Sequence, residues 1–294
     1  MMLAVLFAVI VGTWNGEWFP SGRAEHRAPA EQEERTIRLA GEMIRKGFAE
    51  LDPEGKEDLV LCLNEIRGPK AARSLCEAIG RTNLTVAVVS GYRRRDRFDM
   101  QQDVIATTLP VATSRWSKWK AARGETPPRG YAYAEVVFPS SATVGVYAVH
   151  LKSNYAQTSE GIARTNRVKR TRAIRQIVEQ EKPKRGKRRL PLVIAGDFNA
   201  DAWSPKFKAD EIFSLLDGGG FSNALAAVEG PARVTYPGRG RWGDSVFDYV
   251  FTRDVAVSGE PLVYAPCEVS DHRPVFVRVD CALPERGKAK EGRE

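Results

Sequence analysis

The sequence predicts an α/β protein in which two mixed β-sheets pack face to face and helices cover their outer faces. Short apolar runs typical of buried strands recur along the chain, amphipathic helical segments separate several of them, and the middle of the chain is richer in strands. This mixture fits two packed sheets, although the pattern alone also fits other α/β folds.

The first third of the chain alternates strand and helix. Residues 1–11 are almost wholly apolar and predict a buried first strand, and residues 59–63 and 84–89 predict two more. Apolar side chains recur at helical spacing over residues 37–51, and residues 71–79 are a second helical segment. Each of these helices is expected to cover a sheet.

The rest of the chain adds hairpins and one long helix. Residues 132–138 and 144–149 flank Pro139-Ser140-Ser141, which predicts a turn and antiparallel pairing. A long helix is expected over residues 159–181. Further strands are expected at residues 104–107, 192–195, 246–251 and 275–279.

Length and composition indicate one domain. The chain has 294 residues, of which 43% are hydrophobic, and this is ample for one large core, which we place at residues 1–280. Residues 281–294 lose the apolar pattern and end in charges, so a disordered tail is expected there.

The charge is unevenly distributed. A net charge of +8 favours polyanionic partners without naming one. Residues 164–189 hold 12 basic and two acidic side chains, so the remainder, with 33 basic and 35 acidic, is slightly acidic. The basic segment is either a surface for a polyanion or a solvated helix remote from any site, and the sequence leaves both open.

Cysteine usage and the apolar start bear on the compartment. Cys62, Cys76, Cys267 and Cys281 lack the spacing of a zinc site and the density of a disulfide scaffold, which predicts packing residues in a reducing cytoplasm. Residues 1–11 lack a basic leader and are too short to cross a bilayer, so no transmembrane segment is expected. Secretion stays an alternative because of that apolar start.

Polar side chains gather where predicted strands end. Asp197 and Asn199 follow the strand at 192–195, and residues two apart in an extended chain project to the same side. Asn15 and Glu17 repeat this spacing after the first strand, and Glu65 follows the strand at 59–63. Polar groups gathered at strand ends predict a cleft.

Two of the three histidines lie where an apolar strand meets polar sequence. His150 ends the strand at 144–149, and His272 lies in Ser270-Asp271-His272 before Arg273-Pro274. The proline disfavours helical geometry at the residue before it, so His272 is expected in a loop that enters the last strand. His26 lies in a polar stretch and carries no such signal.

Each motif alone is more often a turn than a site. In chain order, however, the sequence holds Thr13-Trp14-Asn15-Gly16-Glu17, Asn64-Glu65-Ile66, Val149-His150-Leu151-Lys152-Ser153, Gly196-Asp197-Phe198-Asn199, Phe247-Asp248-Tyr249-Val250 and Ser270-Asp271-His272. This set resembles the endonuclease/exonuclease/phosphatase superfamily, whose members include deoxyribonuclease I, exonuclease III, apurinic-site endonucleases, neutral sphingomyelinases and inositol-polyphosphate phosphatases. The similarity runs from Asn15 to His272 and implies a four-layer α/β/β/α sandwich of the deoxyribonuclease I type.

The resemblance also implies a metal site at one edge of the two central sheets. Glu65 would hold a divalent cation, with Asn15, Glu17 and Asp271 beside it. Hard oxygen ligands suit Mg²⁺, with Mn²⁺ as the other candidate, and do not indicate zinc.

The catalytic roles likewise follow from the resemblance. Asp197 would orient and deprotonate the attacking water, and Asn199 would bind the phosphate or that water. His272 would contact the scissile phosphate, with Asp248 fixing its ring, and His150 would act as general acid. Phosphodiester hydrolysis needs such a set, because charge must be neutralised, water activated and the leaving oxygen protonated.

Loops carry the substrate prediction. Apurinic-site enzymes and exonuclease III usually have a Tyr/Pro/Asn motif where this chain has His150 to Asn154, which argues against abasic-site repair. Several loops interleave cations with aromatic rings in a way that suits phosphate contacts and base stacking. The residues expected to contact nucleic acid are Arg93, Arg94, Arg115, Trp116, Lys118, Trp119, Lys152, Asn154, Arg239, Arg241 and Trp242. The alternative for Trp116 and Trp119, three residues apart, is one face of a helix packed on the body.

The sequence therefore predicts a monomeric, magnesium-dependent phosphodiesterase that acts on nucleic acid, with DNA first, and has no stable protein partner. The alternative within enzymes is a phosphoesterase for a phospholipid headgroup or another small phosphorylated substrate. The alternative outside enzymes is a protein that binds nucleic acid without turnover, which the complete set of catalytic residues opposes.

Overall fold

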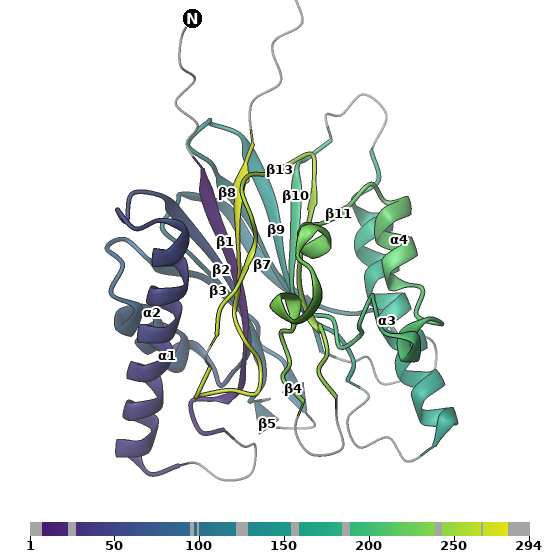
Figure 1. Ribbon diagram of the computed structural model, residues 1–294, viewed down its shortest axis with the longest axis horizontal. Helices are drawn as coiled ribbons and strands as arrows, with labels where there is room; N and C mark the ends of the chain where they lie inside the picture. The colour runs from purple at the N-terminus through teal and green to yellow at the C-terminus, as the bar shows by residue number, and fades with distance from the viewer. Residues whose placement is uncertain are drawn as a thin grey trace, which may run out of the picture.

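The computed structural model describes residues 8–22, 28–94, 97–98, 100–121, 129–153, 159–183, 189–238, 243–265 and 267–281. Two mixed sheets lie face to face in the middle of the molecule. The helices α1 and α2 cover one outer face, and α3 and α4 cover the other (Figure 1). The predicted four-layer sandwich is confirmed.

The first sheet has the strand order β13-β15-β1-β2-β6-β3, with β14 also paired to β15. Its strands are β1 (Val9–Phe19), β2 (Asp58–Ile66), β3 (Thr85–Val89), β6 (Gln102–Thr107), β13 (Ala256–Val257), β14 (Leu262–Val263) and β15 (Val275–Asp280). β1 and β2 run parallel, whereas β15 is antiparallel to β1. The ends of β1 and β2 and the start of β15 therefore lie at the same end of the sheet.

The second sheet has the order β11-β12-β10-β9-β8-β7. Its strands are β7 (Val111–Lys118), β8 (Gly130–Val137), β9 (Thr143–His150), β10 (Leu192–Asp197), β11 (Ser222–Asn223) and β12 (Asp248–Arg253), and a separate hairpin pairs β4 (Arg93–Arg94) with β5 (Arg97–Phe98). β9 and β10 run parallel, and β12 is antiparallel to β10. This sheet thus also gathers two strand ends and one strand start at one end.

The helices are α1 (Ala30–Leu51), α2 (Pro69–Ile79), α3 (Glu160–Gln180) and α4 (Ile212–Gly218), with short 3₁₀ turns at Pro205–Phe207, Ala224–Ala227 and Gly230–Arg233. α1 begins before the apolar spacing predicted, because its first turns are mostly exposed and polar. Glu31 and Glu33 in the first turn suit the positive end of the helix dipole.

The apolar strand residues divide between two layers of core. Val60 and Cys62 pack with residues of the second sheet, while Leu59, Leu61 and Leu63 pack with the residues of α1 and α2. This alternation explains why the strand reads as one continuous apolar run in the sequence, since both of its faces are buried.

The first strand differs from its prediction. β1 continues through Asn15 to Phe19, and its pairing with β2 shifts between these two residues. Glu17 and Trp18 have φ values of 46° and 61°, so the simple alternation of side chains fails there. Residues 1–7, and the tail expected at 281–294 apart from residue 281, lie outside the described residues. Within the part described, no helix is long and apolar enough to cross a bilayer.

Candidate active site

Strand register brings the predicted site residues to one end of the sandwich. His150 and Asp248 both pair with Asp197, because β9 and β12 flank β10. In the first sheet, Asn15 of β1 is opposite Asn64 of β2, which comes one residue before Glu65. These side chains, apart from the slightly exposed Glu65, are buried, so the polar end of the sandwich is a closed floor of charged and amide groups.

The carboxylate of Glu65 is held by the turn that Glu17 and Trp18 make near the end of β1, here called the β1 turn. The main-chain N–H of Trp18 donates to Oε2 at 3.1 Å, and Asn15 Nδ2 lies 3.4 Å from Oε1. Burial raises the pKa of Glu65, while the charge of Arg129 and a hydrogen bond from Gln101 lower it. Glu65 is thus a largely buried acid, 12% exposed, whose charged form depends on nearby cations.

Asp197 accepts several hydrogen bonds. Oδ1 accepts the N–H of Asn199 at 2.8 Å, and Oδ2 accepts the side-chain amides of Asn15 and Asn199, both at 2.9 Å. Burial raises the pKa of this carboxyl to about 7, although the neighbouring charge of His272 lowers it. A carboxylate with a pKa near neutrality suits a general base at neutral pH.

The backbone around the site is strained. Gly196 has a φ of 146°, and a Cβ there would lie 1.9 Å from the carbonyl oxygen of Val149, so only glycine fits. Glu65 and Asn199 have φ values of 59° and 51°, which side chains other than glycine rarely adopt. Such residues gather at functional sites where surrounding contacts impose the conformation.

His272 is held as a cation. Its Nδ1 lies 2.7 Å from Oδ2 of Asp248, and its Nε2 lies 3.9 Å from Asp197 and 3.8 Å from Asp271. Burial alone lowers the pKa of His272, but the charge and hydrogen bond of Asp248, with the other two carboxylates, raise it to about 10. The imidazole is therefore charged at neutral pH.

His150 has the opposite charge state. Its Nε2 lies 3.6 Å from both Glu65 Oε1 and Asp197 Oδ2. Burial, and then the positive charges of Arg129, His272 and Lys152, lower its pKa well below 6.5. His150 is neutral at pH 7, and its buried Nδ1 has no hydrogen-bond partner within the described part of the chain.

Two groups of residues in this floor could hold a cation. Carboxylate and imidazole atoms of Asp197, Asp248 and His272 lie within 4.8 Å of one another. Asp248 is already bonded to the charged ring of His272, however, so a metal there would compete with a proton.

The group around Glu65 fits a metal better. Asn15 contacts Glu65 directly, and Glu17 Oε2 accepts the main-chain N–H of Asp271 at 3.0 Å, which ties the fourth predicted ligand to the β1 turn. These are hard oxygen donors, and the raised pKa of the buried Glu65 shows that its charge lacks full compensation. A divalent cation such as Mg²⁺ matches both properties.

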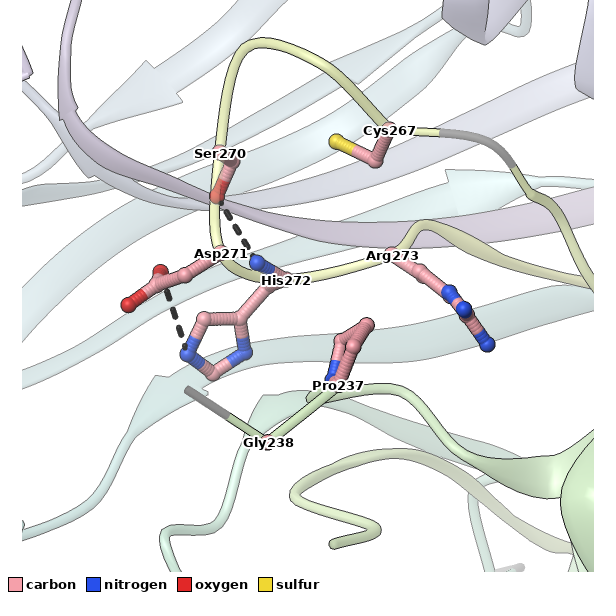
Figure 2. Close-up of a pocket in the computed structure, with 7 residues that line it drawn as sticks. All are labelled: Pro237, Gly238, Cys267, Ser270, Asp271, His272 and Arg273. Atoms are coloured by element: carbon pink, nitrogen blue, oxygen red, sulfur yellow. Dashed lines mark hydrogen bonds and ion pairs between the residues drawn. The ribbon is translucent and has the colours of Figure 1, made fainter. Parts of the chain in front are cut away.

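A cavity of about 280 Å³ opens beside His272 (Figure 2). It is lined by Pro237, Gly238, Cys267, Ser270, Asp271, His272 and Arg273. Ser270 Oγ accepts the N–H of His272 at 3.0 Å and donates to the carbonyl of Asn15 at 2.7 Å, which fixes the histidine loop to β1. The cavity gives a substrate access to one side of the charged ring.

The residues expected to contact nucleic acid fall into three groups: some lie near the site, some lie on other exposed strands, and some lie outside the described residues. Lys152 lies close enough to lower the pKa of His150, whereas Arg93 is exposed on the β4–β5 hairpin. Arg94 lies on the same strand, with its side chain outside what the structure describes. Asn154, Arg239, Arg241 and Trp242 also lie outside the described residues.

The Arg115 to Lys120 segment is an edge strand and its end, not the helix considered as the alternative. Arg115 and Lys118 are exposed on β7, with the guanidinium of Arg115 stacked 3.8 Å from the centre of the Tyr133 ring. Trp116 is 40% exposed, but Trp119 is only 3% exposed. The predicted contact through Trp119 is wrong, because side chains three apart on an extended chain face opposite sides and this indole packs in the core.

The basic segment 164–189 is partly structural. Arg170 is buried and pairs with Asp210, and Arg175 pairs with Glu211 beside α4. Lys169 lies on another face of α3, beside Lys120, and residues 184–188 lie outside the described ranges. The segment therefore combines packing contacts with a cationic surface.

Several residues that act on the site carried no clear signal in the sequence. Arg129 precedes β8, and its charge lowers the pKa values of Glu65 and His150. Asn64 and Asp103 form a buried hydrogen bond behind Glu65. A lone arginine in a Gly- and Pro-rich stretch and an acid inside an apolar strand become visible only once the sheets are paired.

The four layers, with buried carboxylates and histidines at one end of two sheets, define the class of proteins with the deoxyribonuclease I-like fold. A sequence model of the Endonuclease/Exonuclease/phosphatase family matches residues 12–272, and the chain belongs to that family. Members of the family are hydrolases that act on phosphodiester bonds and generally depend on a divalent metal.

Three solved structures show the same fold at low sequence identity. An endonuclease/exonuclease/phosphatase from Beutenbergia cavernae is 18% identical with a TM-score of 0.63, covering 94% of this chain and 72% of that one. D. rerio TDP2 complexed with single strand DNA product is 14% identical, with a TM-score of 0.59 and coverage of 93% and 99%. Sphingomyelinase C from Streptomyces griseocarneus is 18% identical, with a TM-score of 0.60 and coverage of 92% and 99%. Among curated proteins, no sequence matches the chain.

Proposed function

We propose that this chain is a divalent-metal-dependent nuclease that hydrolyses phosphodiester bonds in DNA. The observation that carries the proposal is the meeting of two buried carboxylates with one charged and one neutral histidine. His150 lies 3.6 Å from both Glu65 and Asp197, and His272 lies 3.9 Å from Asp197. This hydrolysis needs a base, a fixed positive charge and a proton donor, and an imidazole that is neutral in the free protein can be the donor once it has gained a proton.

Asp197 is the proposed base. It takes a proton from water as the water oxygen bonds to phosphorus, and its pKa of about 7 suits that task at neutral pH. Asn199, whose amide donates to Asp197, is the proposed contact of the phosphate or of that water.

The two histidines have different proposed roles: His272 neutralises charge on the phosphate, and His150 protonates the leaving oxygen. His272, held as a cation by Asp248, faces negative charge on the nonbridging oxygens. His150 is neutral before substrate binds, because burial and the charges of Arg129 and Lys152 lower its pKa. An anionic phosphate offsets these charges, so His150 can take up a proton from solvent when the substrate binds and give it to the leaving oxygen as the phosphorus–oxygen bond breaks.

The proposed metal residues are Glu65, Asn15, Asp271 and Glu17, with Mg²⁺ first and Mn²⁺ second. When bound, the cation supplies Lewis-acid stabilisation of phosphate charge. Glu65 provides the charge that holds it, and Asn15 positions Glu65 relative to Asp197 through one amide group.

The choice of DNA rests on cations beside the floor. Lys118 pairs with Gly130 at the end of β7, and the N–H of Trp119 donates to the carbonyl of Arg129 at 3.1 Å. Lys118 and Lys120 are exposed there, next to the arginine whose charge reaches Glu65. The chain is about as similar in fold to TDP2 with its DNA product as to a sphingomyelinase, so the fold alone does not distinguish DNA from a phospholipid as the substrate. A row of cations favours a polyanion.

The test is turnover of three substrates by the full chain with Mg²⁺, with Mn²⁺ and with a chelator. The substrates are supercoiled plasmid, bis-p-nitrophenyl phosphate and sphingomyelin vesicles, and Asp197→Asn is the inactive control. We expect metal-dependent cleavage of plasmid and of the aryl diester. Hydrolysis of vesicles with no plasmid cleavage would transfer the function to a phospholipid headgroup, and DNA binding without turnover of any substrate would make the protein a binder.

A further inference from the structure

A further buried acid, Asp103, lies behind the floor. Asp103, on β6, is fully buried and lies on the face of the strand that points between the two sheets, as Ile105 does. Asn64 Nδ2 donates to its Oδ1 at 2.8 Å, and Tyr92 Oη donates to its Oδ2 at 3.0 Å. Burying a carboxyl costs free energy that an apolar side chain at this position would avoid, so its presence calls for a reason beyond packing.

Asn64 connects this acid to the site across the two sheets. Its Oδ1 accepts the main-chain N–H of Asp197 at 3.0 Å. Asn64 belongs to β2 in the first sheet and Asp197 to β10 in the second. One amide side chain therefore joins the sheet that carries Glu65 to the residue that activates water.

The chemistry of Asp103 sets the direction of that amide. Oδ1 of Asp103 accepts a hydrogen bond both in the carboxylate and when a proton is on Oδ2, so Asn64 turns its NH₂ group toward Asp103 and its oxygen toward Asp197. In the reverse orientation, the amide oxygen of Asn64 would face the carboxylate of Asp103, which also accepts, and its NH₂ group would face the N–H of Asp197, which also donates. The N–H of Asp197 is held in this way just after Gly196, where the backbone is already strained.

We propose that Asp103 is a positioning residue for phosphodiester hydrolysis, which orients Asn64 and thereby fixes the main chain of Asp197. This inference rests on the proposed role of Asp197. Asp103 does not touch the substrate; it holds the carboxylate of Asp197 at its distances from His150 and His272. A shift of the reacting groups by ~1 Å can cost roughly 100-fold in rate, so such an anchor has a measurable effect.

The test exchanges the amide and carboxyl groups at positions 64 and 103, one at a time and together, and measures kcat. Asn64→Asp sets two carboxylates against each other, and we expect kcat for the aryl diester to fall by roughly 10- to 100-fold with little change in KM. Asp103→Asn keeps an acceptor for Asn64 and is expected to stay within about threefold of wild type in kcat.

The double variant Asn64→Asp/Asp103→Asn exchanges the two groups and restores the match between donor and acceptors. The amide introduced at position 103 can donate to the carboxylate introduced at position 64, and that carboxylate still accepts the N–H of Asp197. We expect this exchanged pair to recover most of the kcat that Asn64→Asp alone loses.

Thr107→Val is the matched control. Thr107 is also buried on the same face of β6, and its hydroxyl donates to the carbonyl of Leu59 at 2.8 Å, away from the site. This variant should lower the melting temperature without changing kcat. If Thr107→Val lowers kcat as much as Asn64→Asp does, or if the exchanged pair is no more active than Asn64→Asp, Asp103 is only a packing residue.

Hydrogen exchange at the Asp197 amide separates this inference from the proposed function. Exchange should be slow in wild type, faster in Asn64→Asp and slow again in the exchanged pair. If the wild-type protein is inactive but shows this exchange pattern, the proposed function is refuted, while the role of Asp103 and Asn64 in fixing the Asp197 main chain stands. If the exchange rate of the Asp197 amide is the same in all variants, that role is refuted.

Discussion

At the scale of single residues, two acids that look alike in the sequence differ in what surrounds them. Glu65 accepts an N–H from the β1 turn and lies beside the other proposed metal residues. Asp197 accepts amides from both neighbouring asparagines and lies between the two histidines. Removing either charge should therefore change different measurements.

We predict that Glu65→Gln weakens Mg²⁺ binding by at least about tenfold, because glutamine keeps an acceptor but not the charge that holds the cation. Asp197→Asn should lose ~10²–10⁴-fold in kcat and leave the Mg²⁺ affinity much less affected. Calorimetric titration of both variants measures the affinities. Equal losses of affinity would contradict the division of roles.

The histidine pair gives a prediction about relative cost. His272→Ala should lose more activity than His150→Ala, because His272 is the proposed contact of the reacting phosphate and is already charged, while solvent can partly replace a proton donor. Steady-state kinetics on the aryl diester at pH 7 provide the comparison. A more damaging His150→Ala would reverse the assignment.

Asp248 gives a prediction about pH. Burial lowers the pKa of His272, but Asp248, with Asp197 and Asp271, raises it to about 10, so wild-type activity that needs the charged ring is lost only as the pH rises through that value. Asp248→Asn removes the charge, which lowers the pKa of His272, and the alkaline loss of kcat should move to lower pH. A pH–rate profile whose alkaline limb is unchanged in Asp248→Asn would show that His272 does not need its charge.

At the scale of elements, the edge strand β7 carries the test of substrate class. We predict that Lys118→Ala/Lys120→Ala weakens binding of duplex DNA and shallows its salt dependence, by roughly 0.9 in the log–log slope for each phosphate that is no longer neutralised. Hydrolysis of the small aryl diester should stay intact, because neither lysine belongs to the floor. Fluorescence anisotropy at several salt concentrations measures the slope.

A matched pair of cations lies on the helix layer that covers the other sheet. Arg35 and Arg38 lie on α1, which covers the other sheet (Figure 1). Arg35→Ala/Arg38→Ala makes the same change in net charge and should leave the slope unaltered. An equal effect in both double variants would assign DNA binding to overall charge and leave β7 without a specific role.

Element boundaries show where the sequence was informative. The strands at 192–195 and 275–279 were predicted because both faces of each are apolar. β7 was missed because it lies at the sheet edge and exposes almost every side chain, so no apolar alternation marks it. The cations around Trp116 and Trp119 made the two indoles look like one surface, and only tertiary packing shows that Trp119 is buried.

At the scale of the whole molecule, buried acids couple folding to pH. The pKa of Asp103 is raised by burial to about 7 from 3.8, so its contribution to stability is fully present below pH 3.8 and is lost as the pH rises through 7. Asp103→Asn removes this titration. We predict that the melting temperature of the variant, relative to wild type, increases between about pH 4 and pH 8 in metal-free buffer. A constant difference across that range would show that Asp103 does not change its charge with pH.

The motifs at strand ends predicted the floor because parallel strands and antiparallel neighbours bring their polar ends together. The same logic could not find Arg129, Asn64 as a bridge, or Asp103. Each acts across a sheet or between sheets, and no spacing in the chain encodes which strand becomes the neighbour of another. Substrate choice is likewise absent from the motifs, since loops outside the floor determine it.

The pairing of β1 with β15 has a practical consequence. Val9 is opposite Val279, so the start of β1 and the end of β15 lie side by side, at the other end of these strands from Asn15 and His272. A solid support, a fluorescent reporter or a second enzyme attached beside Val9 or Val279 would be held away from the candidate active site. Surface immobilisation for single-molecule work can therefore use this end of β1 and β15, with the candidate active site left facing the solution.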